Sequence, residues 1–217
     1  MINVIYEDNH VLVVEKPINI PVQEDSSKDL DFLTLLKDFI KKRDNKPGNV
    51  YLGLIHRLDR PVGGIMVFAK TSKCASRLSE QVRNRTFKKS YYAIVEGKVE
   101  SKSTLVDKLL KDTKNNIVKV DESGKESILD YELVEYKENL SLVKINLKTG
   151  RSHQIRVQFS SRNHPLYGDQ KYNRNALVGQ QIALFSNSIS FNHPITKESL
   201  TFEIDLPNRK PWNIFKV

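Results

Sequence analysis

Apolar residues recur with two different periods along this 217-residue chain. Residues 28–43 and 72–84 repeat apolar side chains every three or four positions, which predicts two amphipathic helices. The β-branched run from Val11 to Glu15 ends at Lys16-Pro17, which predicts a strand followed by a turn, because the residue before a proline avoids helical geometry. Strand-like patterns also cover residues 91–96, 128–136, 141–148, 153–159, 182–191 and 199–204.

The segment from residue 98 to residue 125 is polar and charged. Residues 111–116 and 121–125 have the composition of hairpin tips, so we expect a surface excursion rather than a separate domain. There is no internal repeat and no low-complexity linker, which predicts one domain over residues 1–217. Many strands with few helices indicate the α+β class, with a mixed, largely antiparallel central sheet flanked by helices and loops.

The charge of the chain narrows the class of partner. Its 35 Lys and Arg residues exceed its 26 Asp and Glu residues by nine, which favours a polyanion, and nucleic acid first. The N-terminus lacks the features of a secretory signal, and no apolar run approaches the roughly 20 residues needed to cross a bilayer. The single cysteine, Cys74, cannot form an intramolecular disulfide and is expected to pack within its helix. We therefore expect a soluble, cytoplasmic protein that does not bind membranes.

Motifs for metals and nucleotide cofactors are missing from the sequence. The five histidines fall in no metal-ligand spacing, and neither a dinucleotide-binding nor a P-loop glycine pattern is present. We expect no metal and no cofactor.

A carboxylate stands between two arginines in the segment 54–70. Asp59 is flanked by Arg57 and Arg60, and a proline, the pair Gly63-Gly64 and a β-like apolar run follow it. This order predicts that Asp59 lies on a loop at the edge of a sheet, where glycines allow another backbone to approach closely. Composition alone leaves two interpretations open: a surface ion pair with a neighbouring arginine, or a site residue on a loop held by a rigid scaffold.

Three further segments have a functional and a structural interpretation. In the predicted strand 153–159, Arg156 shares one polar face with two glutamines, which fits either a binding face or the solvated side of an edge strand. Tyr91 lies in the predicted strand 91–96, where core packing is the ordinary role of an aromatic residue. The basic run 83–89 suits phosphate contacts or a solvated turn, and the net charge favours phosphate.

Taken together, these segments resemble the RluA-like pseudouridine synthase family over almost the whole chain. The residues that carry the resemblance are His56-Arg57-Leu58-Asp59 with Gly64 and Phe68-Ala69-Lys70; Tyr91, Ala93, Val95 and Gly97; Thr149 through Val157 with His164-Pro165-Leu166 and Gly168-Asp169; the opening Tyr6-Glu7-Asp8 with Lys16-Pro17; and Phe191 with His193-Pro194.

The resemblance implies the pseudouridine synthase fold and the conversion of uridine in RNA to pseudouridine without a metal or diffusible cofactor. It makes Asp59 the catalytic carboxylate, which would attack C1′ as a nucleophile or take a proton from C2′ as a base. Arg156 matches the charged partner of that carboxylate, and Leu184 an apolar contact with the uracil. Tyr91 matches the catalytic aromatic residue that stacks beneath the base and assists proton removal at C5. Asp59, Tyr91 and Arg156 are expected to converge in a cleft across the middle of the sheet.

The resemblance also implies how RNA is held. The target nucleotide would leave its stack, Arg57 would fill the vacated space, and Arg60, Lys70 and the run 83–89 would contact phosphates. The first motif begins near residue 5, so we expect no N-terminal RNA-binding accessory domain. We expect a monomer that acts on ribosomal or transfer RNA. Two alternatives remain: a non-catalytic RNA-binding module, and a glycosidic-bond hydrolase, which would normally need a second carboxylate.

Overall fold

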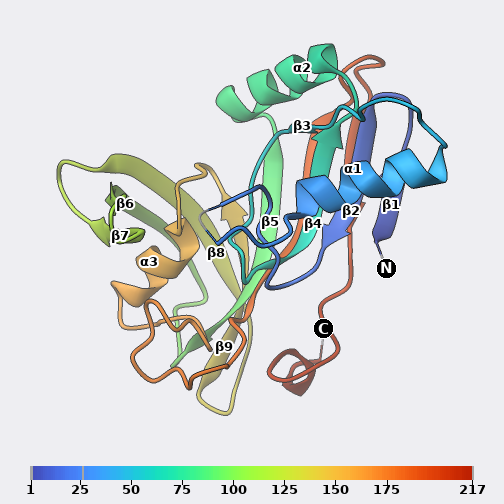
Figure 1. Ribbon diagram of the computed structural model, residues 1–217. Helices are drawn as coiled ribbons and strands as arrows, with labels where there is room; N and C mark the ends of the chain where they lie inside the picture. The colour runs from blue at the N-terminus through green and yellow to red at the C-terminus, as the bar shows by residue number, and fades with distance from the viewer. Residues whose placement is uncertain (1, 26, 217) are drawn as a thin grey trace. The chain divides into compact units, whose positions relative to one another are not determined.

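The chain folds into two compact units (Figure 1). This computed structural model describes residues 2–25 and 27–216. The first unit comprises residues 1–88 and 186–204, and the second comprises residues 89–185 and 205–217. That the whole chain acts as a single catalytic domain stays a prediction.

A sheet covered by two helices forms the first unit. Its elements are β1 (Asn3–Glu7), β2 (Val11–Lys16), α1 (Phe32–Arg43), β3 (Gly53–Leu54), β4 (Gly63–Ala69), α2 (Ser72–Arg83), most of β10 (Leu184–Asn192) and β11 (Ser199–Glu203). The strand order is β1-β2-β4-β10, with β11 paired to β10 and β3 paired to β4. Each of the pairs β1–β2, β2–β4, β3–β4 and β10–β11 is antiparallel.

Both faces of β2 and β4 are covered, which explains why residues 11–14 of β2 and all of β4 are apolar rather than alternating. On one face, α1 lies across the strands, and the ring of Phe32 meets that of Phe68 at 6.1 Å (Figure 1). On the other face, Cys74 of α2 joins a core cluster with Val67 of β4. The expected packing role of Cys74 is therefore confirmed. The apolar run after Asp59 is an interior strand, so the expectation of a sheet edge there was wrong.

Side-chain caps set the starts of both helices. Asp31 accepts a hydrogen bond from the Thr34 amide, so α1 begins at Phe32 rather than at residue 28 as predicted. Thr71 accepts a hydrogen bond from the Cys74 amide at the start of α2, within one residue of the predicted bounds.

The second unit is built on a sheet in the order β5-β9-β8-β6-β7, with every neighbouring pair antiparallel. Its elements are β5 (Lys88–Glu96), β6 (Lys102–Asp112), β7 (Ile117–Val120), β8 (Lys125–Lys137), β9 (Leu140–Leu147), α3 (Gln154–Ser160) and the short 3₁₀ turn Trp212–Ile214. The turns between β6 and β7 and between β7 and β8 fall where the hairpin tips were predicted.

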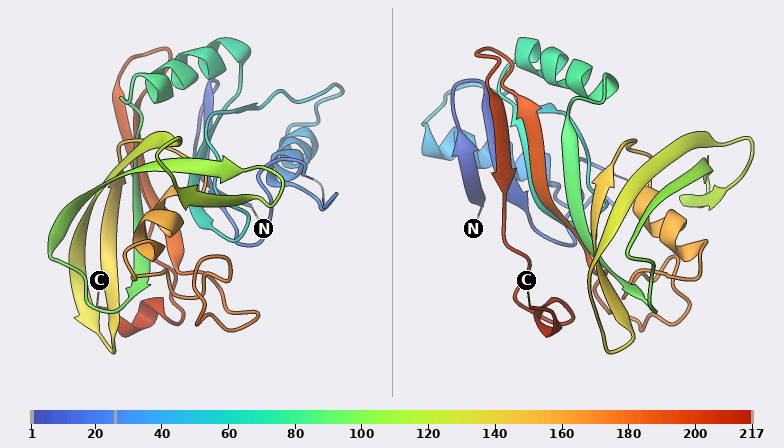
Figure 2. Two further views of the ribbon diagram at one scale, coloured as in Figure 1. Left: turned by 90° about the vertical axis from the view of Figure 1, so that its left-hand side faces the viewer. Right: turned by 180° about the vertical axis from the view of Figure 1, so that it is seen from behind.

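Residues 153–159 are not the strand that we predicted but the helix α3, which packs against β6 and β7 (Figure 2). The six residues from Gln154 to Phe159 are all buried, so no polar face of helical period marks this helix in the sequence. Its buried glutamines are hydrogen-bonded. The side-chain oxygen of Gln154 accepts a hydrogen bond from the Thr149 hydroxyl at 2.9 Å. The side-chain amide of Gln158 donates one to the carboxylate of Asp107 at 2.8 Å.

The predicted α+β class with a largely antiparallel sheet is confirmed. Between residue 2 and residue 216, with residue 26 left aside, no helix is both long enough and apolar enough to span a bilayer.

Candidate active site

The segment carrying Asp59 is a loop, as predicted, and it connects β3 to β4. Inward and outward positions alternate along it: His56 and Leu58 are buried, Arg57 is exposed and Asp59 is half-buried. His56 accepts a hydrogen bond from the Val67 amide at 3.2 Å, and the carbonyl of Asp59 accepts one from the Val62 amide at 2.9 Å. The loop is therefore fixed at both ends, with Arg57 exposed and Asp59 half-buried between them.

A buried lysine holds the second half of this loop. The fully buried Lys16 ammonium donates to the carbonyl oxygens of Pro17 at 2.9 Å, Arg60 at 3.1 Å and Val62 at 2.8 Å. Burial lowers its pKa to about 8; the charge of Asp59 acts against that shift and the charge of Arg60 adds to it. No local motif predicts a site role for Lys16, and the available signal is a lysine that ends an apolar strand.

The three predicted RNA-binding residues of this unit differ in their surroundings. Arg57 is exposed, and Arg60 forms an ion pair with the exposed Asp29.

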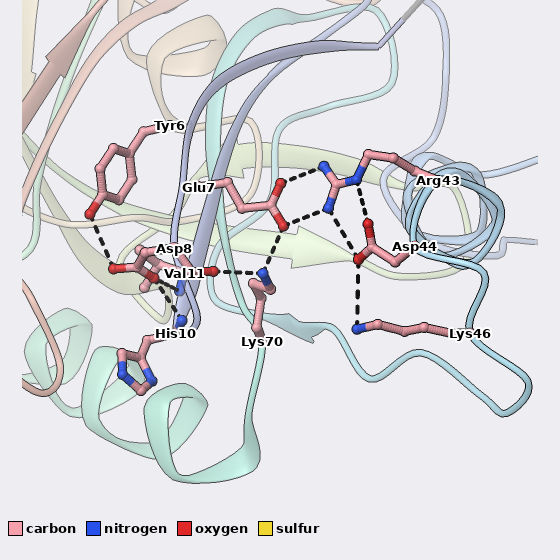
Figure 3. Close-up of polar contacts among 9 residues, drawn as sticks. All are labelled: Tyr6, Glu7, Asp8, His10, Val11, Arg43, Asp44, Lys46 and Lys70. Atoms are coloured by element: carbon pink, nitrogen blue, oxygen red, sulfur yellow. Dashed lines mark hydrogen bonds and ion pairs between the residues drawn. The ribbon is translucent and has the colours of Figure 1, made fainter.

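Lys70 is largely withdrawn from solvent: its ammonium contacts the carboxylate of Glu7 at 2.7 Å and the carbonyl oxygen of Asp8 at 2.6 Å (Figure 3). Arg43 binds the same carboxylate, and this hydrogen bond is the main reason that the pKa of Glu7 is lowered. The phosphate contact of Lys70 stays a prediction, and its charge is already balanced within the fold.

Tyr91, Arg156 and Leu184 belong to the second unit, and all three side chains are buried. Tyr91 lies in β5, Arg156 in α3 and Leu184 at the first position of β10. Asp59, Arg57, Arg60 and Lys70 belong to the first unit. The convergence of Asp59 with Tyr91 and Arg156 stays a prediction.

A buried carboxylate and an aromatic ring hold the side chain of Arg156 within its own unit. Its Nε and Nη2 atoms donate to the two carboxylate oxygens of Asp169 at 2.8 and 2.7 Å, with side-chain exposures of 7% and 0%. The ring of Tyr172 lies 5.1 Å from the guanidinium carbon. Bidentate pairing fixes the plane of a guanidinium as well as its position. Asp169 therefore orients Arg156.

Tyr172 is itself fixed through its hydroxyl. The oxygen accepts a hydrogen bond from the Val118 amide at 2.9 Å and lies 2.6 Å from Nδ1 of His153. His153 precedes α3 with a left-handed backbone, φ 51°. The aromatic ring under Arg156 is thus held from β7 and from the start of α3, an arrangement that the sequence analysis did not predict.

Metal ligation finds no support in the described part of the chain. Among residues 2–25 and 27–216, no group of three or more His, Cys, Asp or Glu side chains is arranged to hold an ion.

The comparisons with known proteins agree on one class. Two solved human structures share the fold: "RNA Pseudouridylate Synthase Domain Containing 4", at TM-score 0.79 and 22% identity over 94% of this chain and 88% of that one, and "RNA Pseudouridylate Synthase Domain Containing 1", at TM-score 0.75 and 22% identity over 95% and 84%. The fold is therefore that of a pseudouridylate synthase domain.

Sequence comparison makes the assignment specific. Residues 10–161 match the profile of the RNA pseudouridylate synthase family, and the chain belongs to that family of isomerases, as the resemblance implied. A relative from Bacillus subtilis named "Uncharacterized RNA pseudouridine synthase YhcT" is 31% identical over 95% of this chain and 69% of its own length. "Ribosomal large subunit pseudouridine synthase C" of Vibrio parahaemolyticus is 34% identical over 94% and 65%. The same-named protein of Buchnera aphidicola is 33% identical over 91% and 64%. The chain thus spans about two thirds of the length of these curated relatives.

Proposed function

We propose that this protein isomerises uridine to pseudouridine in ribosomal RNA. The family match supports the reaction, and the names of the Vibrio and Buchnera relatives support the large ribosomal subunit as the source of the target. In this reaction the N1–C1′ bond breaks, the uracil turns, and C5 joins C1′; C5 loses its proton and N1 gains one, so the composition of the nucleotide is unchanged. Transfer RNA would be the alternative substrate.

The observation that carries the proposal is the loop that presents Asp59. A carboxylate that must reach the sugar of a nucleotide needs a fixed backbone, and the loop from His56 to Val62 has one: the Val67 amide holds His56, and Lys16 holds Arg60 and Val62. Asp59 would attack C1′ or remove a proton from C2′.

Two buried residues of the second unit complete the proposed machinery. Arg156 would keep the catalytic carboxylate ionised, and its bidentate pair with Asp169 means that it would act as an oriented fork rather than as a mobile charge. Tyr91 would lie against the uracil face, with Leu184 as an apolar contact.

A stacked uridine is out of reach of a protein carboxylate, so the nucleotide would have to leave its stack, at a cost of a few kcal/mol. Arg57, exposed two residues before Asp59, would occupy the vacated space. Arg60 and residues 83–89 would add phosphate contacts whose strength falls with salt.

The decisive experiment maps pseudouridine in ribosomal RNA after incubation with wild type and with Asp59→Asn. We expect wild type to form pseudouridine, Asp59→Asn to form none, and RNA affinity to survive in the variant. Asp38→Asn, on the exposed side of α1, is the matched control and should retain full activity. Substantial turnover by Asp59→Asn would remove Asp59 from the reaction.

The same assay separates the rival functions. An RNA-binding module would bind without forming pseudouridine, and a hydrolase would release free uracil. Arg156→Lys keeps a positive charge but loses the planar fork, so we expect a loss of roughly 100-fold or more in kcat. Arg162→Lys, at a half-exposed ion pair with Asp107, is its control.

A further inference from the structure

Lys89 is the second residue of β5 and faces the same side of that strand as Tyr91. Alternation along a strand places residues 89, 91 and 93 on one face and Ser90 and Tyr92 on the other. The contacts agree with this division. Ser90 donates to Asn146 at 2.6 Å, and the ammonium of Lys144 lies 5.7 Å from the centre of the Tyr92 ring.

The side chain of Lys89 is half-buried. In the described residues, neither a hydrogen bond nor an ion pair reaches it, and burial alone lowers its pKa. Lys16 shows the contrast, since three carbonyl oxygens accept from its ammonium. An ammonium has three donors to satisfy, and the partial burial of Lys89 reduces the access of water to them.

The neighbouring backbone leaves room for this ammonium. A Cβ built on Gly150 would lie 3.0 Å from Nζ of Lys89, so a side chain at position 150 would crowd the charged group. Gly150 follows β9 and precedes the loop that leads to α3. The ammonium of Lys89 therefore lies beside Gly150, in the segment that joins β9 to the helix of Arg156.

We propose that Lys89 binds the phosphate of the target nucleotide itself, the nucleotide whose base lies against Tyr91. This inference rests on the proposed function and adds a subsite to it. Two residues along a strand span about 7 Å, a distance that fits a base on Tyr91 with its own phosphate on Lys89. An RNA phosphate supplies the acceptors that the protein withholds, and the excess of nine positive charges favours that anion over a carboxylate.

The structure also distinguishes Lys89 from the rest of the basic run 83–89. Arg83, Arg85 and Lys88 are exposed, and exposed charges contact phosphates of any sequence through screened attraction. Lys89 is the half-buried member, and a charge-assisted hydrogen bond gains strength where fewer waters compete for it.

The first test measures RNA affinity in the Asp59→Asn background, so that no substrate is consumed. Adding Lys89→Met should weaken binding by about 10- to 100-fold and make the slope of log K against log salt shallower by roughly 0.7 to 1. Lys89→Arg should restore most of the affinity, because it keeps the charge. Lys144→Met, on the opposite face of the sheet, is the matched control and should change neither quantity by a comparable amount.

The second test identifies the anion. In the wild type, RNA with a neutral methylphosphonate beside the mapped uridine should lose about the same 10- to 100-fold in kcat/KM. In Lys89→Met the methylphosphonate should cost little more, because the partner is already missing. Losses that multiply would overturn the inference, as would unchanged affinity and salt slope in a Lys89→Met protein with normal circular dichroism. If the wild type itself forms no pseudouridine, the proposed function has failed, and the affinity data still decide whether Lys89 binds phosphate.

Discussion

In the interior of the second unit, the carboxylate of Asp169 accepts two hydrogen bonds from the guanidinium of Arg156, at 2.8 Å from Nε and 2.7 Å from Nη2. The carboxylate also accepts from the amide of Lys171 at 3.0 Å, so its own position is tied to the backbone that follows it. Because both partners are buried, the pair orients Arg156 only while both charges are present.

Asp169→Asn should therefore be strongly destabilising. It leaves the buried guanidinium without its bidentate acceptor, and we expect the free energy of unfolding to fall by about 3–5 kcal/mol, measured by urea denaturation. Asp130→Asn breaks an exposed pair with Lys148 in the same unit and should cost about 1 kcal/mol or less. Equal losses of unfolding free energy in the two variants would contradict the role of Asp169 in holding Arg156.

Tyr172 should act on kcat through Arg156. Tyr172→Phe keeps the ring beneath the guanidinium but removes the hydroxyl that joins Val118 to His153, whereas Tyr172→Leu removes the ring as well. A cation–π contact of this kind is worth roughly 0.5–2 kcal/mol, so Tyr172→Leu should lower kcat about 3- to 30-fold more than Tyr172→Phe, with little change in KM. Steady-state kinetics on the mapped RNA would show this. Identical kcat values for the two variants would mean that the ring does not hold Arg156.

Sequence pattern predicted the elements that have one apolar and one polar face. The helix α2 was placed within one residue because Thr71 caps it and its apolar positions recur at helical period. By the same logic α3 was missed, because burial on every side leaves no period to detect. The start of α1 was misplaced by four residues, since the Asp31 cap competes with the apolar Leu30 as the signal for its beginning.

Only the parts of the candidate site that lie in local sequence motifs could be predicted. Asp59, Tyr91 and Arg156 each lie in such a motif. Lys16 lies 44 residues from the carbonyl of Arg60 that it binds, and Asp169 lies 13 residues from Arg156. These pairs depend on tertiary contacts, and nothing in the local pattern of either partner specifies the other.

Lys16 should make stability depend on pH in an identifiable window. Its pKa in the fold is about 8, below the value of about 10.4 in an unfolded chain, so the unfolded state binds more protons between these pH values. The contribution of this group to the free energy of unfolding therefore rises by on the order of 3 kcal/mol as the pH rises from 8 to about 10.4. The same contribution is lost as the pH falls back through that interval to 8. The difference in unfolding free energy between wild type and Lys16→Met should grow in favour of wild type from pH 7.5 to pH 10.

Urea denaturation of both proteins at several pH values measures that difference directly, and groups that titrate in both proteins cancel. Lys41→Met, at the exposed end of α1, is the control and should give a flat difference. A flat difference for Lys16→Met as well would show that the ammonium is not desolvated as its surroundings indicate.

Gly64 should tolerate no side chain. Its φ is 123°, in the region that favours glycine, and a Cβ there would run into the backbone of Ser186, 2.6 Å from its nitrogen and 2.8 Å from its carbonyl carbon. Ser186 is itself fixed, because its hydroxyl donates to the Ile65 carbonyl at 3.2 Å. Since β4 and β10 are neighbours in the first unit, relief would require the two strands to separate. Gly64→Ala should lower the free energy of unfolding by at least about 2–3 kcal/mol, measured by urea denaturation. Gly48→Ala, where a Cβ meets nothing within 4 Å, should stay within about 0.5 kcal/mol of wild type, and a Gly64→Ala midpoint equal to that control would show that the strands can move apart without loss.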